Sequence, residues 1–586
     1  MGSVINIIKS KSEFITKIFI TFLIVFSLIN IGVFKVFDAL TIFMLIIVYS
    51  FIKRTNINAI DTKTNILSLI MSFMFSISLI LGGIINNNFL NYEMSYFQEL
   101  FKINNILSIV GIAMLVYFVI INIYSFFDKI NIKNDKKKYN TKKMFWVFFA
   151  IMMISWTIYL LSYYPVIISY DSAYQIKEIM GIIGYDNHHP VLHTIIIKVF
   201  LDIGKSIFNS YTIGCLFYSL FQMISLSLIF SYTLLFIYKR EIKFKYIILF
   251  LLYFTLSPAF GFYSVTMWKD VLFGGVFLLF GLYVYSLYEK RKLIKIKDYI
   301  VFILLGLLFA LFRNNGIYIL LLISPFMIYK FIDKKKMIGS FLIMFATYFI
   351  LIGPVYKMIG IEKTESAEYI SIPLEQVGRI VKEHGKIDDN EAILINKLID
   401  IGNLSAVYNP GIVDAIKMSE SYNPEVFENN KLEYLKLWAS LVFKNIGIAC
   451  EAYASITLGY WYPNLDYWAV YDLENYDNVI NVQQHHLTPI GIMAYTHTVA
   501  AYDIPFISLL YSVALYFWIA LLFYIYSIKK KVTNTSVYIL AFALLLTLLV
   551  ASPVYGEFRY IFGVVCSMPL LISIPFMKER KNEDEI

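Results

Sequence analysis

Long, almost uncharged apolar runs recur along most of this 586-residue chain, and they leave it few ways to fold. A run of about 17 to 25 apolar residues matches the thickness of a bilayer when it is helical, because each backbone group is then hydrogen-bonded within the run. Hydrophobic residues make up 59% of the chain and charged residues only 16%, which is not typical of a soluble protein of this size. The sequence therefore predicts an all-α polytopic membrane protein.

The apolar runs predict about fourteen transmembrane helices. Their ranges are 14–34, 37–52, 65–84, 105–127, 144–163, 212–238, 246–260, 270–288, 298–312, 316–330, 338–356, 504–527, 535–551 and 558–576. The first run follows basic residues without a clear small-residue cleavage site, so we expect it to be an uncleaved span. The sequence shows no internal repeat, and we expect no broken helices.

Lysine and arginine gather in every second connection between the runs. The basic segments are the N-terminus, 53–63, 129–143, 239–245, 290–297, 334–336, 529–531 and 578–581. Because basic loops stay in the cytoplasm, this alternation predicts cytoplasmic N- and C-termini in a bacterial-type plasma membrane. The formal net charge of +9 is concentrated in these segments, so it does not indicate nucleic-acid binding. Three isolated cysteines have no metal or redox spacing and receive no role.

The alternation divides the chain into four parts. Residues 1–143 form an N-terminal module of four membrane helices and a cytoplasmic Lys-rich loop. Residues 144–356 form a transmembrane core with an extracytoplasmic loop at 164–211. Residues 357–503 form an extracytoplasmic domain that is rich in Trp, Tyr, Ile and Leu, and is therefore folded. Residues 504–586 form the C-terminal transmembrane helices and a cytoplasmic tail.

Two amphipathic helices are expected in the extracytoplasmic domain. They run from Ser371 to Lys382 and from Asn390 to Ile401. Glu375 and Arg379 are four residues apart in the first of them. That spacing predicts an ion pair on the helix surface.

One stretch of the loop at 164–211 combines an acidic residue with a helix start. Ser172 and Gln175 have the spacing of a capping box, which predicts a helix that begins just after Asp171. The carboxylate of Asp171 then lies at the positive end of the helix dipole, where its ionised form is favoured. Apolar residues fall on one face of this helix, as in a helix that lies along a membrane surface.

Three histidines, His188, His189 and His193, follow in the same loop. Pro190 suits the first turn of a second, short helix, on which His189 and His193 would share a face. Neutral imidazoles four residues apart can share a metal ion. No cysteine or acidic residue has ligand spacing with them, so hydrogen bonding to a substrate, or packing, is the favoured role.

Further ionisable residues fall on the same side of the membrane in the predicted topology. They belong to the motifs Trp268-Lys269-Asp270, Arg313-Asn314 and Glu557-Phe558-Arg559-Tyr560, which adjoin predicted spans. A charge at the edge of the hydrocarbon is costly unless it is paired or used, so these residues are functional candidates.

Lys269, Arg313 and Arg559 together could bind a phosphate or pyrophosphate group, such as that of a polyprenyl-phosphate carrier. Asp171 would then be the general base for an acceptor hydroxyl, or the ligand of a divalent cation, Mg²⁺ or Mn²⁺, that holds the phosphate. No other cofactor is indicated.

Each candidate also has a purely structural alternative. Asp171 could cap a helix. Lys269 and Asp270 could form a structural ion pair. The two arginines could contact ordinary lipid headgroups, with Glu557 as a nearby counterion.

The position of Asp171 resembles that of a catalytic residue in the GT-C superfamily of membrane glycosyltransferases. Those enzymes use lipid-phosphate-linked sugars and place a catalytic Asp in the first large extracytoplasmic loop of a polytopic core, before a surface helix. Together with Tyr170-Asp171-Ser172 and His188-His189-Pro190, the membrane-edge motifs also look like those of poorly characterised bacterial polytopic proteins grouped with that superfamily. The resemblance covers roughly residues 144–576.

The resemblance implies a GT-C-like core and an activity, the transfer of a hexosyl or related sugar from a polyprenyl-phosphate donor to an extracytoplasmic glycan or lipid of the cell envelope. Asp171 would be catalytic. The residues that would bind the sugar or the phosphate are His188, His189, Lys269, Arg313 and Arg559. The residues that would support them are Tyr170, Ser172, Gln175, His193, Asp270, Asn314, Glu557 and Tyr560.

The sequence departs from the superfamily pattern in two ways. Ser172 follows Asp171 where many members carry a second acidic residue, and the core begins at the fifth predicted span. Two other functions fit the same charges. One is a transporter or flippase of lipid-linked saccharide, which would use the anion pocket without chemistry. The other is a polymerase or ligase that joins preassembled glycans.

Overall fold

The computed structural model describes residues 2–35, 39–57, 60–92, 94–130, 132, 139–363, 370–465, 479–489 and 508–578. Eight helices in these ranges are long and apolar enough to cross a membrane, or up to nine if one bent pair counts as a single span. The protein is therefore a helical membrane protein with several spans, as predicted. Each of the fourteen predicted ranges contains helix, but fourteen crossings stay a prediction, since several of these helices are short.

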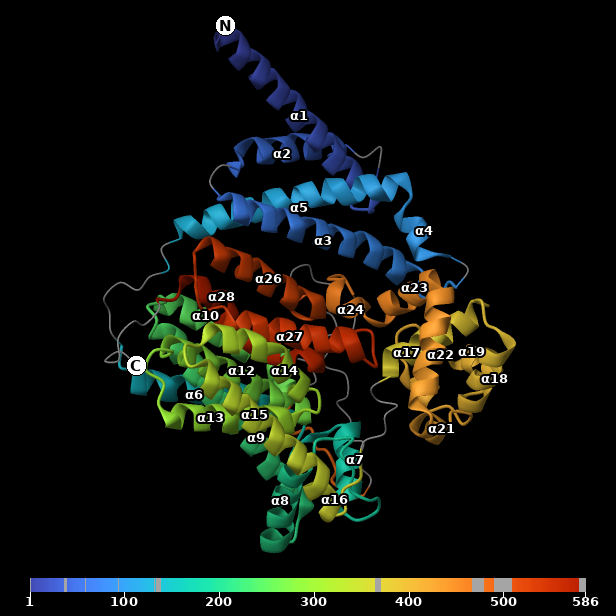
Figure 1. Ribbon diagram of the computed structural model, residues 1–586. Coiled ribbons are helices and arrows are strands. Elements are labelled where there is room, and N and C mark those ends of the chain that lie inside the picture. Colours follow the sequence, from blue (N-terminus) through green and yellow to red (C-terminus); the bar gives the residue numbers. More distant parts are fainter. Residues whose placement is uncertain are drawn as a thin grey trace.

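The helices before the core lie together at the top of Figure 1. They are α1 (Gly2–Asn30), α2 (Leu40–Arg54), α3 (Thr62–Asn87), the short α4 (Tyr96–Leu100) and α5 (Ile103–Lys129). Helix α3 packs on α26 (Val513–Lys529) of the C-terminal part. Asp128 at the end of α5 pairs with Lys529 and, at 2.7 Å, with Lys530. The Lys-rich stretch 133–138, residues 504–507 of the twelfth predicted span and the tail after 578 lie outside the described residues.

The core is a bundle around two of the most enclosed long helical segments, α12 (Lys269–Glu289) and the segment that contains α28 (Phe562–Ser573). Gly563 of α28 lies against the ring of Phe277 of α12, so a side chain at Gly563 would overlap that ring. Small residues let membrane helices approach closely in this way. Lys269 begins α12, and Arg559 lies in the 3₁₀ turn η5 (Phe558–Ile561) just before α28. The close packing therefore holds both cations at the same end of the bundle.

The remaining core elements surround this pair. They are α6 (Thr141–Ser162), α9 (Tyr211–Tyr238), α10 (Phe244–Leu256), α11 (Pro258–Val265), α13 (Ile296–Phe312), α14 (Gly316–Lys330), α15 (Lys334–Ile350), the π-helical turn η2 (Leu351–Val355), α16 (Tyr356–Met358), the 3₁₀ turn η4 (Ser508–Leu510), α27 (Ser536–Ala551) and the 3₁₀ turn η6 (Ile574–Phe576).

The predicted span at 246–260 is broken, contrary to the expectation of unbroken helices. It consists of α10 and α11, which meet at a bend of 53°. Pro258 is the first residue of α11 and has no N–H to continue the hydrogen bonding of α10. After the bend the chain forms β2 (Thr266–Met267), which pairs in parallel with β1 (Ile167–Ile168). This pairing places the segments that precede Asp171 and Lys269 side by side.

Helix α7 (Tyr170–Ile179) begins earlier than the predicted capping box indicates. Its N-cap is Ser169, whose hydroxyl accepts a hydrogen bond from the N–H of Ser172 at 3.4 Å. The hydroxyl of Ser172 instead donates to the carbonyl of Met267, so it is not free to cap the helix. Asp171 still lies in the first turn, at the positive end of the helix, as predicted.

The second helix of the loop is longer than predicted. It is α8 (Val191–Phe208), with 18 residues, and it packs along α9. Pro190 is its N-cap residue rather than part of its first turn. Figure 1 shows α7, α8 and α16 together at the lower end of the molecule.

Residues 370–456 form a helical unit with its own apolar core, at the right of Figure 1. Its helices are α17 (Ser371–Lys382), α18 (Asp389–Leu398), α19 (Ile401–Val407), α20 (Asp414–Lys417), α21 (Pro424–Asn429), α22 (Lys431–Lys444) and α23 (Ile446–Ile456). The next helix, α24 (Leu458–Trp461), packs on α26 of the C-terminal part instead. The predicted helix from Ser371 to Lys382 is confirmed with its bounds. The second predicted helix begins at Asp389 and ends three residues early, at Leu398.

The predicted surface pair of Glu375 and Arg379 is wrong, because both side chains are buried. Arg379 donates to Glu383 at 2.7 Å and to Glu451 at 3.2 Å. Glu451 also accepts a hydrogen bond from Ser95 beside α4, at 2.6 Å, which ties the unit to the N-terminal helices. Burial raises the pKa of Glu375 to about 8.

Candidate functional site

Three residues that are far apart in the sequence meet at one carboxylate oxygen. Oδ2 of Asp171 accepts a hydrogen bond from Lys269 and another, at 2.8 Å, from Nη1 of Arg559. Asp171 and Arg559 are buried, with 5% and 6% of their surface exposed. Each side chain comes from a different element. Asp171 lies in the first turn of α7, Lys269 is the first residue of α12, and Arg559 lies in the turn η5.

A second set of ion pairs adjoins the first. Arg313 lies 3.3 Å from Oδ1 of Asp270 and donates to the carbonyl of Tyr560 at 2.8 Å. Arg559 lies 4.0 Å from Oδ2 of Asp270 and 3.4 Å from Glu557. Arg313 thus belongs to the cluster through Asp270 and does not contact Asp171 directly.

The cluster contains three cations and three carboxylates, so its formal charges balance. The cations are Lys269, Arg313 and Arg559, and the carboxylates are Asp171, Asp270 and Glu557. A phosphate group could therefore bind here only by taking cations away from carboxylates. The binding energy of such a ligand would include the cost of breaking these pairs.

The neighbouring charges keep Asp171 ionised. Burial alone would raise its pKa, but Arg559 and Lys269 outweigh burial and hold the pKa well below its usual range. Burial and Lys269 also lower the pKa of His189 well below its usual range, so its ring is neutral. Nδ1 of His189 lies 3.2 Å from Nζ of Lys269 and can accept a hydrogen bond from it.

Aromatic rings enclose the guanidinium group of Arg559. Its carbon lies 5.2 Å from the ring centre of Tyr170, 4.8 Å from that of Trp268 and 5.1 Å from that of Tyr560. These distances suit cation–π interactions. The hydroxyl of Tyr170 also accepts a hydrogen bond from Arg559. The indole N–H of Trp268 is buried without a hydrogen-bond partner among the described residues.

Gln175 of α7 and His193 of α8 contact each other and do not take part in the ion pairs. Nδ1 of His193 is 2.8 Å from the side-chain oxygen of Gln175, and Nε2 is 2.7 Å from the hydroxyl of Tyr218. Burial lowers the pKa of His193 to about 3. His189 precedes α8, whereas His193 lies within it and bonds to Gln175 and Tyr218. The two histidines therefore do not share a helix face, contrary to the prediction, and His193 has a packing role.

Sequence reasoning missed Tyr218 and Gln222, which extend this support into α9. Tyr218 donates to Gln222 at 3.0 Å. The Gln222 amide lies within hydrogen-bond distance of two carbonyls of α11 and of the carbonyl of Thr266 in β2, the last at 2.8 Å. Gln222 is the only amide side chain in α9, and an amide inside a predicted span is the signal that could have found this pair.

The loop that carries His188 and His189 is held from several elements. Asn314 donates to the carbonyl of Asn187 at 2.8 Å and to that of His188 at 3.3 Å. The backbone of Glu362, which follows α16, bonds to both Tyr185 and Asn187. His188 itself is exposed, with its ring centre 4.6 Å from that of His189. Asn314 thus acts on the loop rather than on the ion pairs.

Glu178 links α7 to this loop, and its burial predicts that the stability of the folded protein depends on pH. Its carboxyl accepts the N–H of Asp186 at 2.9 Å, and burial raises its pKa from 4.5 to about 7. The folded protein then holds a proton that the unfolded chain releases above pH 4.5. Stability from this group is thus greatest at low pH and is lost as the pH rises toward 7.

We expect the unfolding temperature of the wild type to fall by about 2 to 4 °C, relative to that of Glu178→Gln, between pH 5 and pH 8. The measurement is thermal unfolding in detergent across this pH range. Because glutamine keeps the acceptor oxygen but does not titrate, equal pH profiles for the two proteins would rule out a buried, titrating Glu178.

The residues around Asp171 do not fit a protein-held divalent cation. No group of three His, Cys, Asp or Glu side chains within the described ranges is arranged to hold a metal ion. Asp171 already carries two cationic partners, which would repel a metal ion at the same carboxylate.

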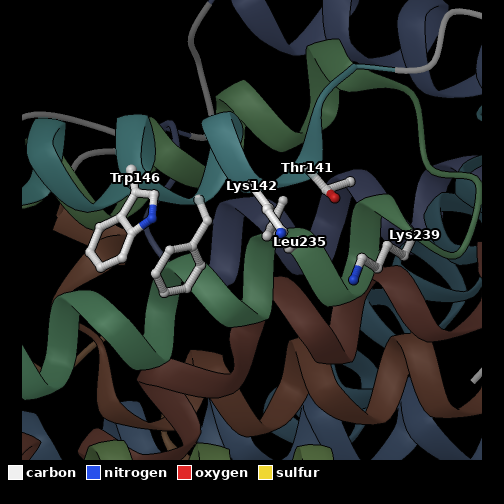
Figure 2. A pocket seen from close by; sticks show the side chains of 6 residues that line it. Thr141, Lys142, Trp146, Leu235 and Lys239 are labelled. Carbon is white, nitrogen blue, oxygen red and sulfur yellow. The ribbon is translucent and has the colours of Figure 1, made fainter.

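A separate pocket lies at the opposite end of α6 from the segment that leads to Asp171 (Figure 2). It is lined by Thr141, Lys142, Phe145, Trp146, Leu235 and Lys239. These residues come from the start of α6 and the end of α9, next to basic connections. The pocket has basic and aromatic walls without a carboxylate, and none of the predicted site residues lines it.

Residues 184–585 match a family of unknown function, DUF6020. The matched region begins after Asp171. It includes the three histidines of the loop (His188, His189 and His193) and the cations Lys269, Arg313 and Arg559. No curated protein and no solved structure matches the chain.

Proposed function

Because the chain belongs to the DUF6020 family, whose function is unknown, we propose an activity from the site alone: an integral membrane glycosyltransferase of GT-C type. It would transfer a sugar from a polyprenyl-phosphate donor to an extracytoplasmic acceptor of the cell envelope. The observation that carries this proposal is the convergence of Lys269 and Arg559 on the carboxylate of Asp171. A buried acid beside two cations can serve a reaction in which a hydroxyl loses a proton while a phosphate departs.

In the proposed reaction the acceptor oxygen forms a bond to the anomeric carbon of the donor sugar. The bond from that carbon to the lipid phosphate breaks, and the phosphate leaves with the electron pair. The acceptor proton passes to Asp171. Lys269 and Arg559 stabilise the charge on the departing phosphate, with Arg313 behind them.

The ion pairs suggest that donor binding activates Asp171. While both cations contact its carboxylate, the low pKa makes Asp171 a weak base. A donor phosphate would draw Lys269 and Arg559 toward itself, and the loss of their field would raise the pKa of the carboxyl. Asp171 would then become a stronger base only when the donor is bound. This arrangement would limit the unwanted reaction of the donor with water.

Exposed aromatic side chains next to the ion pairs could contact a sugar. Tyr170 and Tyr174 are 41% and 37% exposed, and His188 is exposed beside them. Aromatic faces and hydroxyl groups of this kind bind sugar rings through apolar and polar contacts. We assign acceptor binding to these three residues and assign the positioning of Lys269 to His189.

The charge pattern supports the proposed topology, with fourteen spans and both termini in the cytoplasm. Helix α12 begins with Lys269 at the site and ends at Glu289, where the basic segment 290–297 follows. Since basic connections stay cytoplasmic, the site would face the outside of a bacterial-type plasma membrane.

The bend between α10 and α11 favours one alternative, a flippase of lipid-linked saccharide, because broken helices are common in transporters. A polymerase or ligase of preassembled glycans would differ only in the length of its donor.

The test uses purified protein in liposomes with a panel of radiolabelled polyprenyl-phosphate sugars and crude envelope acceptor. We expect label to move from the lipid to the acceptor, with release of polyprenyl phosphate and no effect of a chelator. Movement of intact donor across the bilayer without its consumption would support the flippase and refute the enzyme. Turnover only with oligosaccharide donors would support the polymerase or ligase.

A further inference from the structure

The helical unit at 370–456 carries an apolar strip that faces away from its own core. The strip starts at the corner between α22 and α23 with Phe443 and Ile446, which are 80% and 62% exposed. It continues along α23 with Cys450 and Tyr453, both exposed. The spacing from Ile446 to Cys450 and on to Tyr453 places these three residues on one face of the helix.

Helix α23 has no exposed charge to hold this strip in water. Its single charged residue, Glu451, is buried on the other face and is paired with Arg379. Ala449 and Ala452 are also buried on that side. The helix thus has one face packed on the unit and one exposed apolar face, which meets another described element only where Tyr453 reaches α27.

The strip is continuous with a predicted membrane helix. The hydroxyl of Tyr453 donates to the carbonyl of Leu549 in α27 at 3.1 Å. Leu546 and Val550 of α27 are 49% and 70% exposed, as expected for side chains that face lipid. An apolar surface of this extent, next to lipid-facing residues, marks a membrane contact more readily than a water-facing surface.

We propose that the corner formed by Phe443, Ile446, Cys450 and Tyr453 is inserted in the bilayer leaflet on the side of the Asp171 site. Helix α23 lies in the interface, with the strip among the acyl chains and Tyr453 at the boundary. Lys444, at the end of α22, points back to Asp388 and Glu391 of the unit and stays outside the hydrocarbon. The unit would therefore be anchored to the membrane at this corner and not only by the flanking spans.

The native cysteines provide a test that needs no substitution in the strip. Cys450 is exposed, whereas Cys215 and Cys566 are buried, so a thiol-reactive fluorophore should label Cys450 selectively. With the labelled protein in liposomes, we expect strong quenching by phospholipids that carry a nitroxide on the acyl chain and weak quenching by iodide in the water.

The matched control is Cys450→Ser combined with Glu425→Cys, which moves the label to an exposed position on α21 of the same unit. We expect the opposite pattern there, with quenching by iodide several-fold stronger than quenching by lipid. Cys450→Ser alone reports any labelling of the buried cysteines. A second variant, Ile446→Asp, should weaken lipid quenching at Cys450.

Two outcomes would overturn the proposal. Iodide quenching at Cys450 equal to that at the control position would show that the strip is in water. Protection from both quenchers, together with a dimer crosslinked through Cys450, would show that a second copy of the chain covers it.

Discussion

Replacement of Asp171 by asparagine is expected to lower the rate of sugar transfer by about 10²- to 10⁴-fold. The amide keeps the shape of the side chain but can neither accept the acceptor proton nor hold Lys269 and Arg559 by charge. The measurement is turnover of labelled polyprenyl-phosphate sugar by purified variants in liposomes, with thermal unfolding of each variant recorded in parallel.

Asp270→Asn is the matched control for this prediction. It removes one carboxylate from the same cluster, but Asp270 contacts Arg313 and Arg559 and does not contact Lys269 in the ion pairs of the described residues. We expect similar destabilisation and a much smaller loss of activity. Equal losses of activity in the two variants would mean that the balance of charge, and not the carboxylate of Asp171, supports turnover.

Replacement of Arg559 by glutamine is expected to destabilise the protein by about 3–5 kcal/mol, because it takes a cationic partner away from the buried carboxylates of Asp171 and Glu557. Arg559 contacts Asp171 at 2.8 Å and Glu557 at 3.4 Å, and it packs between aromatic rings. Arg559→Lys keeps the charge but cannot make both contacts, so we expect partial stability and little activity.

A double-mutant cycle separates the structural part of this effect from the functional part. Asp171→Asn with Arg559→Gln removes both members of the pair, so its loss of stability should be well below the sum of the single losses. The double variant should remain inactive. Strictly additive losses of stability would show that the two side chains do not interact in the folded protein.

The positions of the helices could be predicted because the apolar pattern alone determines them. The sixth predicted span, 212–238, differs by one residue from α9 (Tyr211–Tyr238). The predicted order of the spans also brings Asp171, Lys269 and Arg559 together, since in that topology every second connection lies on the same face. The contacts among these three side chains agree with that prediction.

Other features depend on contacts between distant residues, which a single sequence does not reveal. Helix α7 begins at Tyr170, earlier than predicted, because the hydroxyl of Ser172 bonds to Met267, 95 residues away, and does not cap the helix. Arg379 is buried rather than exposed because Glu451, 72 residues later, is its partner. The orientation of His193 depends likewise on Tyr218 in a neighbouring helix. Local spacing located these helices but assigned the side chains to the wrong neighbours.

The order of the cluster residues along the chain also constrains how the protein is made. Arg559 is synthesised after all other members of the cluster, and Asp171 before them. A nascent chain that still lacks its last helix has inserted Asp171 with Lys269 but without the guanidinium group that completes the cluster. Glu557 is synthesised together with Arg559, so such a chain keeps two cations, Lys269 and Arg313, and two carboxylates, Asp171 and Asp270. Asp171 nevertheless has only one of its two cationic partners at that stage, so we expect the proposed activity to appear only once the segment that carries Arg559 has packed against α12.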